Sequence, residues 1–230
     1  MSFNPNASPF NALPPVVVYL SVALALPELA FQLGDAGLFS HLAEGRGLRA
    51  LAIQNFGFFG ELQAWMFQNG TFRWDGLIRY VTYPFVHGSF VHVIFAVVFT
   101  LALGKMVAEV FSTVSVLAIF LGSAVAGAFV YGLVFPVNSL LIGGYPAAYG
   151  LIGGYTFILW VGYGAAGENQ YRAFQLIGFL MALQLLFGLL FGAGNDWVAD
   201  VVGFITGFGL SVGVSPGGFS RLLRQIRSRR

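Results

Sequence analysis

Long apolar stretches separated by short polar ones dominate the chain. Six of them are long enough to cross about 30 Å of hydrocarbon; they cover residues 14–34, 91–111, 114–135, 147–164, 173–193 and 197–214. The pattern predicts an all-α polytopic membrane protein, a six-helix transmembrane bundle that forms one domain over residues 1–230. Residues 35–90 carry charges among short amphipathic stretches such as Leu48 to Trp65 and predict a long outer loop, partly embedded in the membrane, with Trp65 and Trp74 as interface anchors.

Composition supports a membrane setting. Hydrophobic residues make up 57% of the chain and charged residues 9%, whereas a soluble domain is about a quarter charged. The 31 glycines and 25 phenylalanines suit a bundle in lipid, where small residues let helices approach and bulky apolar ones face acyl chains. Water is therefore excluded as the main solvent of this chain.

Basic residues gather at the C-terminal end. Five of the eleven lie in the last ten positions: Arg221, Arg224, Arg227, Arg229 and Arg230. By the positive-inside rule the tail 215–230 is cytoplasmic, and six spans put the N-terminus on the same side. Membrane lipid is the expected partner of this tail, and nucleic acid is not. Met1 to Pro15 contains no Lys or Arg, so we expect no signal peptide and favour a bacterial inner (plasma) membrane.

Ionisable residues within apolar runs are costly in hydrocarbon and are candidate sites. Glu28 and Glu109 fall near span ends, where we expect them to reach water or pair with Lys105. Asp200 lies deeper and borders small residues at a spacing of four, Ala199, Gly203 and Gly207. That spacing predicts a packed face, with the glycine-rich stretch 143–154 as its partner, and directs Asp200 into the bundle.

His87 and His92 complete the candidates, five positions apart. Two histidines and one aspartate suit a metal in principle, but histidines at a membrane entry more often bond loop backbone, so we expect no metal and no cofactor. The chain has no cysteine, which excludes disulfides, thiolate metal sites and thiol nucleophiles.

Three motifs resemble the rhomboid family of intramembrane serine proteases. Arg79, Thr82, Phe85, His87 and His92 match the opening of the family's second span in register. The stretch 143–153 aligns without a gap to the Gly-x-Ser-Gly region of its fourth span. Ala199, Gly203 and Gly207 match its sixth span. The resemblance covers residues 75–214 and implies the rhomboid six-helix fold.

The same resemblance implies that no catalytic residue set is intact. Tyr145 stands where the family has its nucleophilic serine, Asp200 where it has the general-base histidine, and Ala96 where it has an oxyanion-stabilising asparagine; His87 is retained. A phenol is a poor acyl acceptor, and a carboxylate does not replace the imidazole that carries the proton. We expect instead a binding or structural polar cluster of His87, His92, Tyr145 and Asp200, in which Tyr145 donates a hydrogen bond to Asp200.

Three functions remain open. The leading one is a proteolytically inactive rhomboid pseudoprotease that binds transmembrane helices of client proteins, or lipid. The second is an active intramembrane serine endopeptidase with non-standard catalytic residues, for which Ser89, Ser123 and Ser139 lie near the right depth. The third is ion-coupled transport through Asp200, with His87 as a proton relay.

Overall fold

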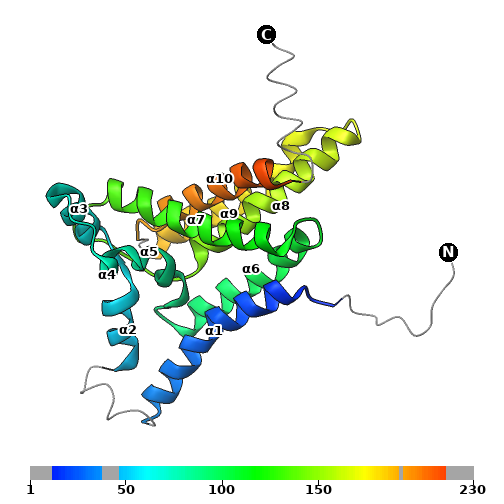
Figure 1. The fold of residues 1–230 in the computed structure, drawn as a ribbon. Coiled ribbons are helices and arrows are strands. Elements are labelled where there is room, and N and C mark those ends of the chain that lie inside the picture. Colours follow the sequence, from blue (N-terminus) through cyan, green and yellow to red (C-terminus); the bar gives the residue numbers. More distant parts are fainter. Residues whose placement is uncertain (1–11, 38–46, 192–193, 216–230) are drawn as a thin grey trace.

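The computed structural model of the protein describes residues 12–37, 47–191 and 194–215, and these are almost entirely helical (Figure 1). The long helices are α1 (Pro15–Asp35), α6 (Phe90–Ala108), α7 (Thr113–Val134), α8 (Tyr145–Ala165), α9 (Gln175–Phe191) and α10 (Trp197–Val214). Between α1 and α6 lie the shorter α2 (Leu48–Phe56), α3 (Gly60–Asn69), α4 (Trp74–Leu77), α5 (Arg79–Thr82) and the 3-10 turn η2 (Tyr83–Phe85). A second 3-10 segment, η3 (Gln170–Phe174), precedes α9.

The six long helices coincide with the six apolar runs of the sequence, which confirms the all-α polytopic fold class. Among the described helices, α1, α6, α7 and α10 have the length and hydropathy of membrane spans. Helices α8 and α9 are 21 and 17 residues long and contain no charged residue. The protein is therefore a multi-pass integral membrane protein.

Local chemistry sets where the helices begin. The hydroxyl of Ser89 accepts a hydrogen bond from the His92 amide at the start of α6, and Ser112 does the same for the Ser115 amide in α7. Each such cap satisfies a backbone N–H that the helix leaves free. Pro15 at the first position of α1 has no N–H to satisfy.

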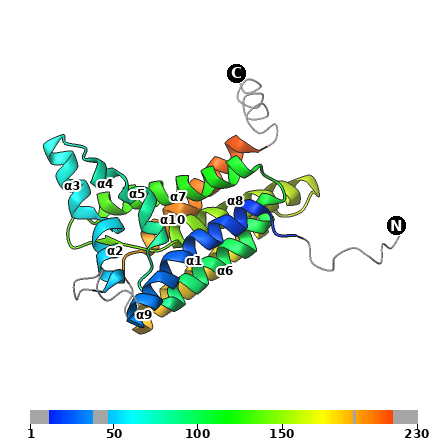
Figure 2. The same cartoon turned by 60° about the horizontal axis from the view of Figure 1, so that its bottom comes forward.

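Helix α8 lies at the centre of the bundle and contacts α6, α7 and α10, while α1 packs on α6 (Figures 1 and 2). The contact between α8 and α10 is built on glycine. A Cβ added at Gly203 would collide with the backbone of Pro146, and one at Gly207 with the backbone of Gly150. The predicted packing of the 199–207 face against the 143–154 stretch is therefore confirmed.

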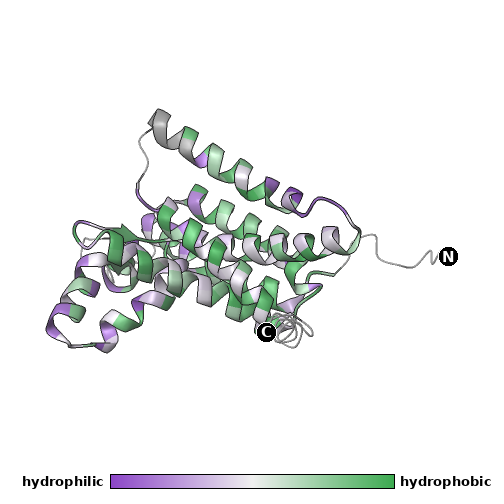
Figure 3. Ribbon diagram, turned by 90° about the horizontal axis from the view of Figure 1, so that it is seen from above, coloured by the Kyte–Doolittle hydropathy of each residue, from purple (hydrophilic) through white to green (hydrophobic). Residues whose placement is uncertain are grey.

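The loop after α1 is more broken than predicted. Helix α2 ends at Phe56, and the next residues form strand β1 (Phe58–Phe59), which pairs antiparallel with β2 (Leu140–Leu141). The predicted amphipathic stretch from Leu48 to Trp65 is thus two helices divided by a short strand. Trp65 and Trp74 are both exposed, as membrane-interface anchors require. Hydrophilic residues gather mainly in the connections and short helices, and hydrophobic ones along the bundle (Figure 3).

One expected partner was wrong. Glu28 neither reaches water nor pairs with Lys105: its side chain is 2% exposed and forms a bidentate ion pair with Arg49 of α2 at 2.7 and 2.9 Å. The loop folds back over the end of α1 and supplies this cation, which a pattern of spans does not reveal. Glu109 does behave as expected, because it is exposed and lies 3.9 Å from Lys105. The predicted cytoplasmic tail falls, apart from Ser215, outside the described residues.

Candidate functional site

His87 connects the start of α6 to the start of α8. It lies in the turn between η2 and α6 and is fully buried. Its Nε2 accepts a hydrogen bond from the backbone N–H of Gly144 at 3.2 Å, so the ring proton is on Nδ1. Burial and, second, the neighbouring His92 lower the pKa of His87 to about 3. The imidazole therefore stays neutral at physiological pH and accepts a backbone bond, as expected for a histidine at a membrane entry.

The backbone around His87 is fastened as well. The Nη1 of Arg49 donates to the His87 carbonyl at 2.9 Å while it also holds Glu28. The N–H of Gly143 donates to the carbonyl of Tyr83 at 3.0 Å. The turn before α6 is consequently tied to α1, α2 and the segment that leads into α8.

His92 lies between His87 and Tyr145. Its ring centre is 5.0 Å from that of His87 and 4.5 Å from that of Tyr145. Gly143 makes this approach possible: it has a φ of +92°, and a Cβ there would collide with the His92 ring. Nε2 of His92 and Nδ1 of His87 are buried and have no hydrogen-bond partner within the described residues. Three of the four residues of the predicted polar cluster are thus adjacent.

Asp200, the fourth residue, has a different partner from the one expected. It is buried, with 1% exposure, and its Oδ2 accepts a hydrogen bond from Nε2 of Gln184 in α9 at 2.8 Å. Tyr149 donates to Oε1 of the same Gln184 at 3.4 Å. Within the described part of the chain Tyr145 makes no hydrogen bond to Asp200, whose Oδ1 has no partner. The predicted Tyr145 to Asp200 bond is wrong, because α9 supplies the donor while the Tyr145 ring packs on His92.

Ala96 is the residue for which the resemblance implies an asparagine in the family. It is fully buried on α6, and a Cβ at Gly144 would lie 3.6 Å from its methyl group. An asparagine amide here would be a hydrogen-bond donor close to the start of α8; the methyl group offers packing alone.

The serines considered as alternative nucleophiles have other roles. Ser139 donates to the Phe135 carbonyl at 2.6 Å and accepts from the Gly60 N–H at 3.1 Å. Ser89 is the exposed cap of α6 and accepts from the amide, not the ring, of His92. Ser123 is buried, and its hydroxyl has no hydrogen-bond partner among the described residues. A serine hydroxyl hydrogen-bonded to an imidazole is therefore absent from the part of the chain that the structure describes.

The site has limited capacity to bind a metal. Within residues 12–37, 47–191 and 194–215, no three His, Cys, Asp or Glu side chains lie close enough together to hold an ion. Asp200 and the two histidines are consequently separate features of the bundle rather than one ligand set.

Two important residues were missed at the sequence level. Gln184 lies in the middle of the apolar run 173–193, whose other glutamine, Gln175, lies near its start. An amide in hydrocarbon needs a partner just as an ionisable group does, and this is the signal that could have identified Gln184. Arg49 carried no comparable signal, because its partner Glu28 lies 21 positions away across a connection.

Known proteins are similar to this chain over more than half of its length. A model of the Rhomboid domain matches residues 75–217. The chain is also similar to Rhomboid-like protease 1 of Toxoplasma gondii, with 25% identity over 128 residues, which is 56% of this chain and 44% of that protein. The chain thus matches less than half of the length of that relative.

Proposed function

The chain belongs to the rhomboid family, and from this premise we propose that it binds transmembrane segments of client proteins without cutting them. The observation that carries the proposal is the environment of Asp200, which occupies the position of the family's general base. Its carboxylate is bonded to Gln184, not to a hydroxyl on α8. A rhomboid-type reaction needs a serine hydroxyl and an imidazole that exchange a proton; the two positions hold the phenol of Tyr145 and the carboxylate of Asp200 instead.

The groups around Tyr145 support the same proposal. Its phenol ring packs on His92, and the next residue, Pro146, has no N–H to offer a developing oxyanion. Ala96 removes another donor. The loss of one oxyanion donor costs about 10²–10³ in rate, and the dyad is missing as well, so no measurable peptide cleavage is expected.

We propose that the bundle still admits a partner from the side, through the lipid. We propose that the client is a single transmembrane helix, and that the protein resides in a bacterial inner membrane with both termini in the cytoplasm. The basic tail supports this orientation, since Lys and Arg are enriched on the cytoplasmic side. Similarity to Rhomboid-like protease 1 of Toxoplasma gondii favours the competing proposal, an active endopeptidase with non-standard catalytic residues.

Labelling with a fluorophosphonate separates the two proposals. The purified protein and an active rhomboid are treated in parallel, and intact mass with peptide mapping locates any adduct. We expect no adduct under conditions that label the active enzyme. Stoichiometric modification at one serine, lost in its alanine variant, would establish a relocated nucleophile; Ser89→Ala and Ser139→Ala are the first variants to compare.

Client binding needs its own readout. A photo-reactive residue at Phe95 or Val91, both exposed on α6, is introduced into the full-length protein in membranes. We expect cross-links to the transmembrane segments of client proteins, and we expect each cross-linked client to keep the mass of the uncut protein. Cross-linked clients that accumulate as two fragments would contradict the proposal.

A further inference from the structure

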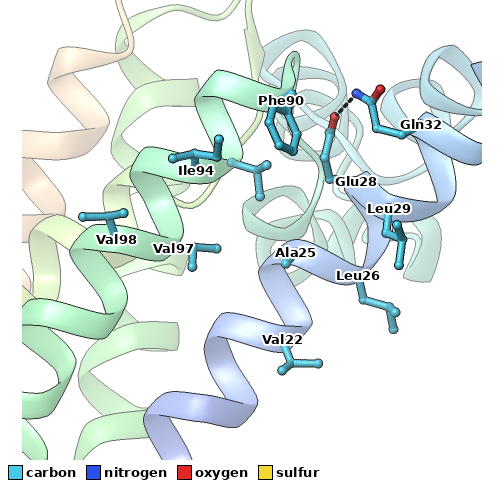
Figure 4. A pocket seen from close by; sticks show the side chains of 11 residues that line it. Val22, Ala25, Leu26, Glu28, Leu29, Gln32, Phe90, Ile94, Val97 and Val98 are labelled. Carbon is cyan, nitrogen blue, oxygen red and sulfur yellow. Dashed lines mark hydrogen bonds between the residues drawn. The ribbon is translucent and has the colours of Figure 1, made fainter. Parts of the chain in front are cut away.

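A lipid-facing groove runs between α1 and α6. Val22, Leu26 and Leu29 line it from α1, and Phe90, Ile94 and Val98 from α6 (Figure 4). Its volume is about 490 Å³. Both helices have the character of membrane spans, so hydrocarbon chains surround the opening of the groove.

The length and lining of the groove indicate what can fill it. From Val22 to Gln32 it follows α1 for ten residues, about 15 Å at the rise of an α-helix. Nine of its eleven lining residues are apolar, so a groove of this length between two membrane spans suits an acyl chain of a surrounding lipid.

One end of the groove is polar. Glu28, Gln32 and Asp35 follow one another along the same face of α1 at positions i, i+4 and i+7, and Gln32 donates to Glu28 at 2.8 Å (Figure 4). Arg49 pairs with Glu28 and lies 3.9 Å from Asp35. Two carboxylates against one guanidinium leave a net negative charge among the side chains described there. Asp35 lies three residues beyond Gln32, the last residue of α1 that lines the groove, and its side chain is 59% exposed, so a headgroup held at this end of the groove can approach it.

We propose that this groove is a binding site for a phospholipid with an ammonium-bearing headgroup such as ethanolamine. One acyl chain lies in the groove from Phe90 toward Val22 and Val98. The ammonium lies over Asp35 and Gln32, where it neutralises the excess carboxylate. An anionic headgroup is disfavoured there because it adds negative charge to a negative end. A lipid so placed stabilises the contact between α1 and α6 and does not depend on whether clients are bound or cut.

Native mass spectrometry of the full-length protein tests the site. Phosphatidylethanolamine and phosphatidylglycerol with identical acyl chains are titrated separately into the delipidated protein in detergent. We expect one retained phosphatidylethanolamine and about fivefold weaker retention of phosphatidylglycerol, as expected when one charge contributes about 1 kcal/mol near a membrane surface.

Two variants locate the site. Ala25→Trp places an indole in the groove, whereas Ala30→Trp makes the same change at an exposed position of α1 outside it. We expect Ala25→Trp to lose the retained lipid and Ala30→Trp to keep it. Asp35→Asn should retain both lipids about equally.

Three outcomes would overturn the proposal. Equal retention by Ala25→Trp and Ala30→Trp would place the lipid elsewhere. Equal retention of both lipids by the unmodified protein would reject the role of Asp35. A co-purifying polypeptide in place of a lipid, displaced by Ala25→Trp, would make the groove a protein-binding site. Circular dichroism of each variant confirms that a lost lipid does not reflect lost helix.

Discussion

We expect Glu28 and Arg49 to stabilise the protein only when both side chains are present. It is bidentate, with N–O distances of 2.7 and 2.9 Å, and the side chains are 2% and 19% exposed. Removing one partner of a buried pair costs about 3–5 kcal/mol, because the other charge is left without compensation. Since water has partial access to Arg49, we expect Arg49→Met to lower the free energy of unfolding by about 2–4 kcal/mol.

A double-mutant cycle separates the energy of the interaction between Glu28 and Arg49 from the separate contributions of the two side chains. Arg49→Met, Glu28→Met and the double variant are unfolded reversibly in mixed micelles of dodecyl sulfate and a mild detergent. The double variant buries no unpaired charge, and apolar replacements of buried pairs are often neutral or stabilising. We therefore expect it to be more stable than Arg49→Met alone, with a coupling energy of about 1.5–3 kcal/mol.

Additive losses would refute this reasoning. If the double variant were destabilised by the sum of the single changes, the two side chains would act through separate contacts, such as the bond from Arg49 to the His87 carbonyl. The pair of Arg73 and Asp75 is the control. It is also bidentate, at 3.0 Å, but lies exposed on the surface, so Arg73→Met should leave stability unchanged.

Three further predictions follow from the contacts of the bundle. Gly207→Ala should destabilise the protein by about 1–3 kcal/mol, because the added methyl group meets the Gly150 backbone. Gly209→Ala, where the added methyl group has open space, should not destabilise it. Unfolding in mixed micelles measures both variants. The pKa of His87 is lowered to about 3, so below about pH 6.5 the unfolded chain takes up a proton that the folded chain does not. The free energy of unfolding should therefore fall by up to about 1.4 kcal/mol per pH unit below that value. A His87→Gln variant unfolded at pH 7 and at pH 5 should show a weaker fall. Gln184→Leu should leave both Asp200 oxygens without partners, destabilise the protein by about 1–3 kcal/mol and speed hydrogen exchange in α9. Adding Asp200→Leu should recover the lost stability. A double variant no more stable than Gln184→Leu alone would contradict the role of this bond.

Much of the fold could be predicted because membrane spans impose simple requirements. A run of uncharged apolar residues long enough for the hydrocarbon is a strong signal, and the spacing of Ala199, Gly203 and Gly207 identified the packed face of α10. Asp200 borders that face, so its burial followed from the same spacing.

Partner choice in the site was harder to predict. The position of Asp200 on α10 was clear, yet its donor came from α9, where Gln184 lies between Leu183 and Leu185. Hydrophobic periodicity reports which face of a helix is buried, not which neighbour a particular polar atom meets. The Arg49 contact was out of reach for the same reason, since it depends on how the loop folds back over α1.

The position of Asp200 connects these observations. Close contact between α8 and α10 is set by glycine at 150, 203 and 207 and does not depend on which polar side chains border it. Tyr145 can therefore turn toward His92 and Asp200 toward Gln184 without disturbing the packing that places them. The bond from Gln184 to Asp200 joins α9 to α10, beside the apolar contacts that α9 makes with the core through Ile177 and Leu180. At a position where the family resemblance implies proton transfer, we expect Asp200 to hold a neighbouring helix, which requires a buried hydrogen-bond acceptor and no nucleophile.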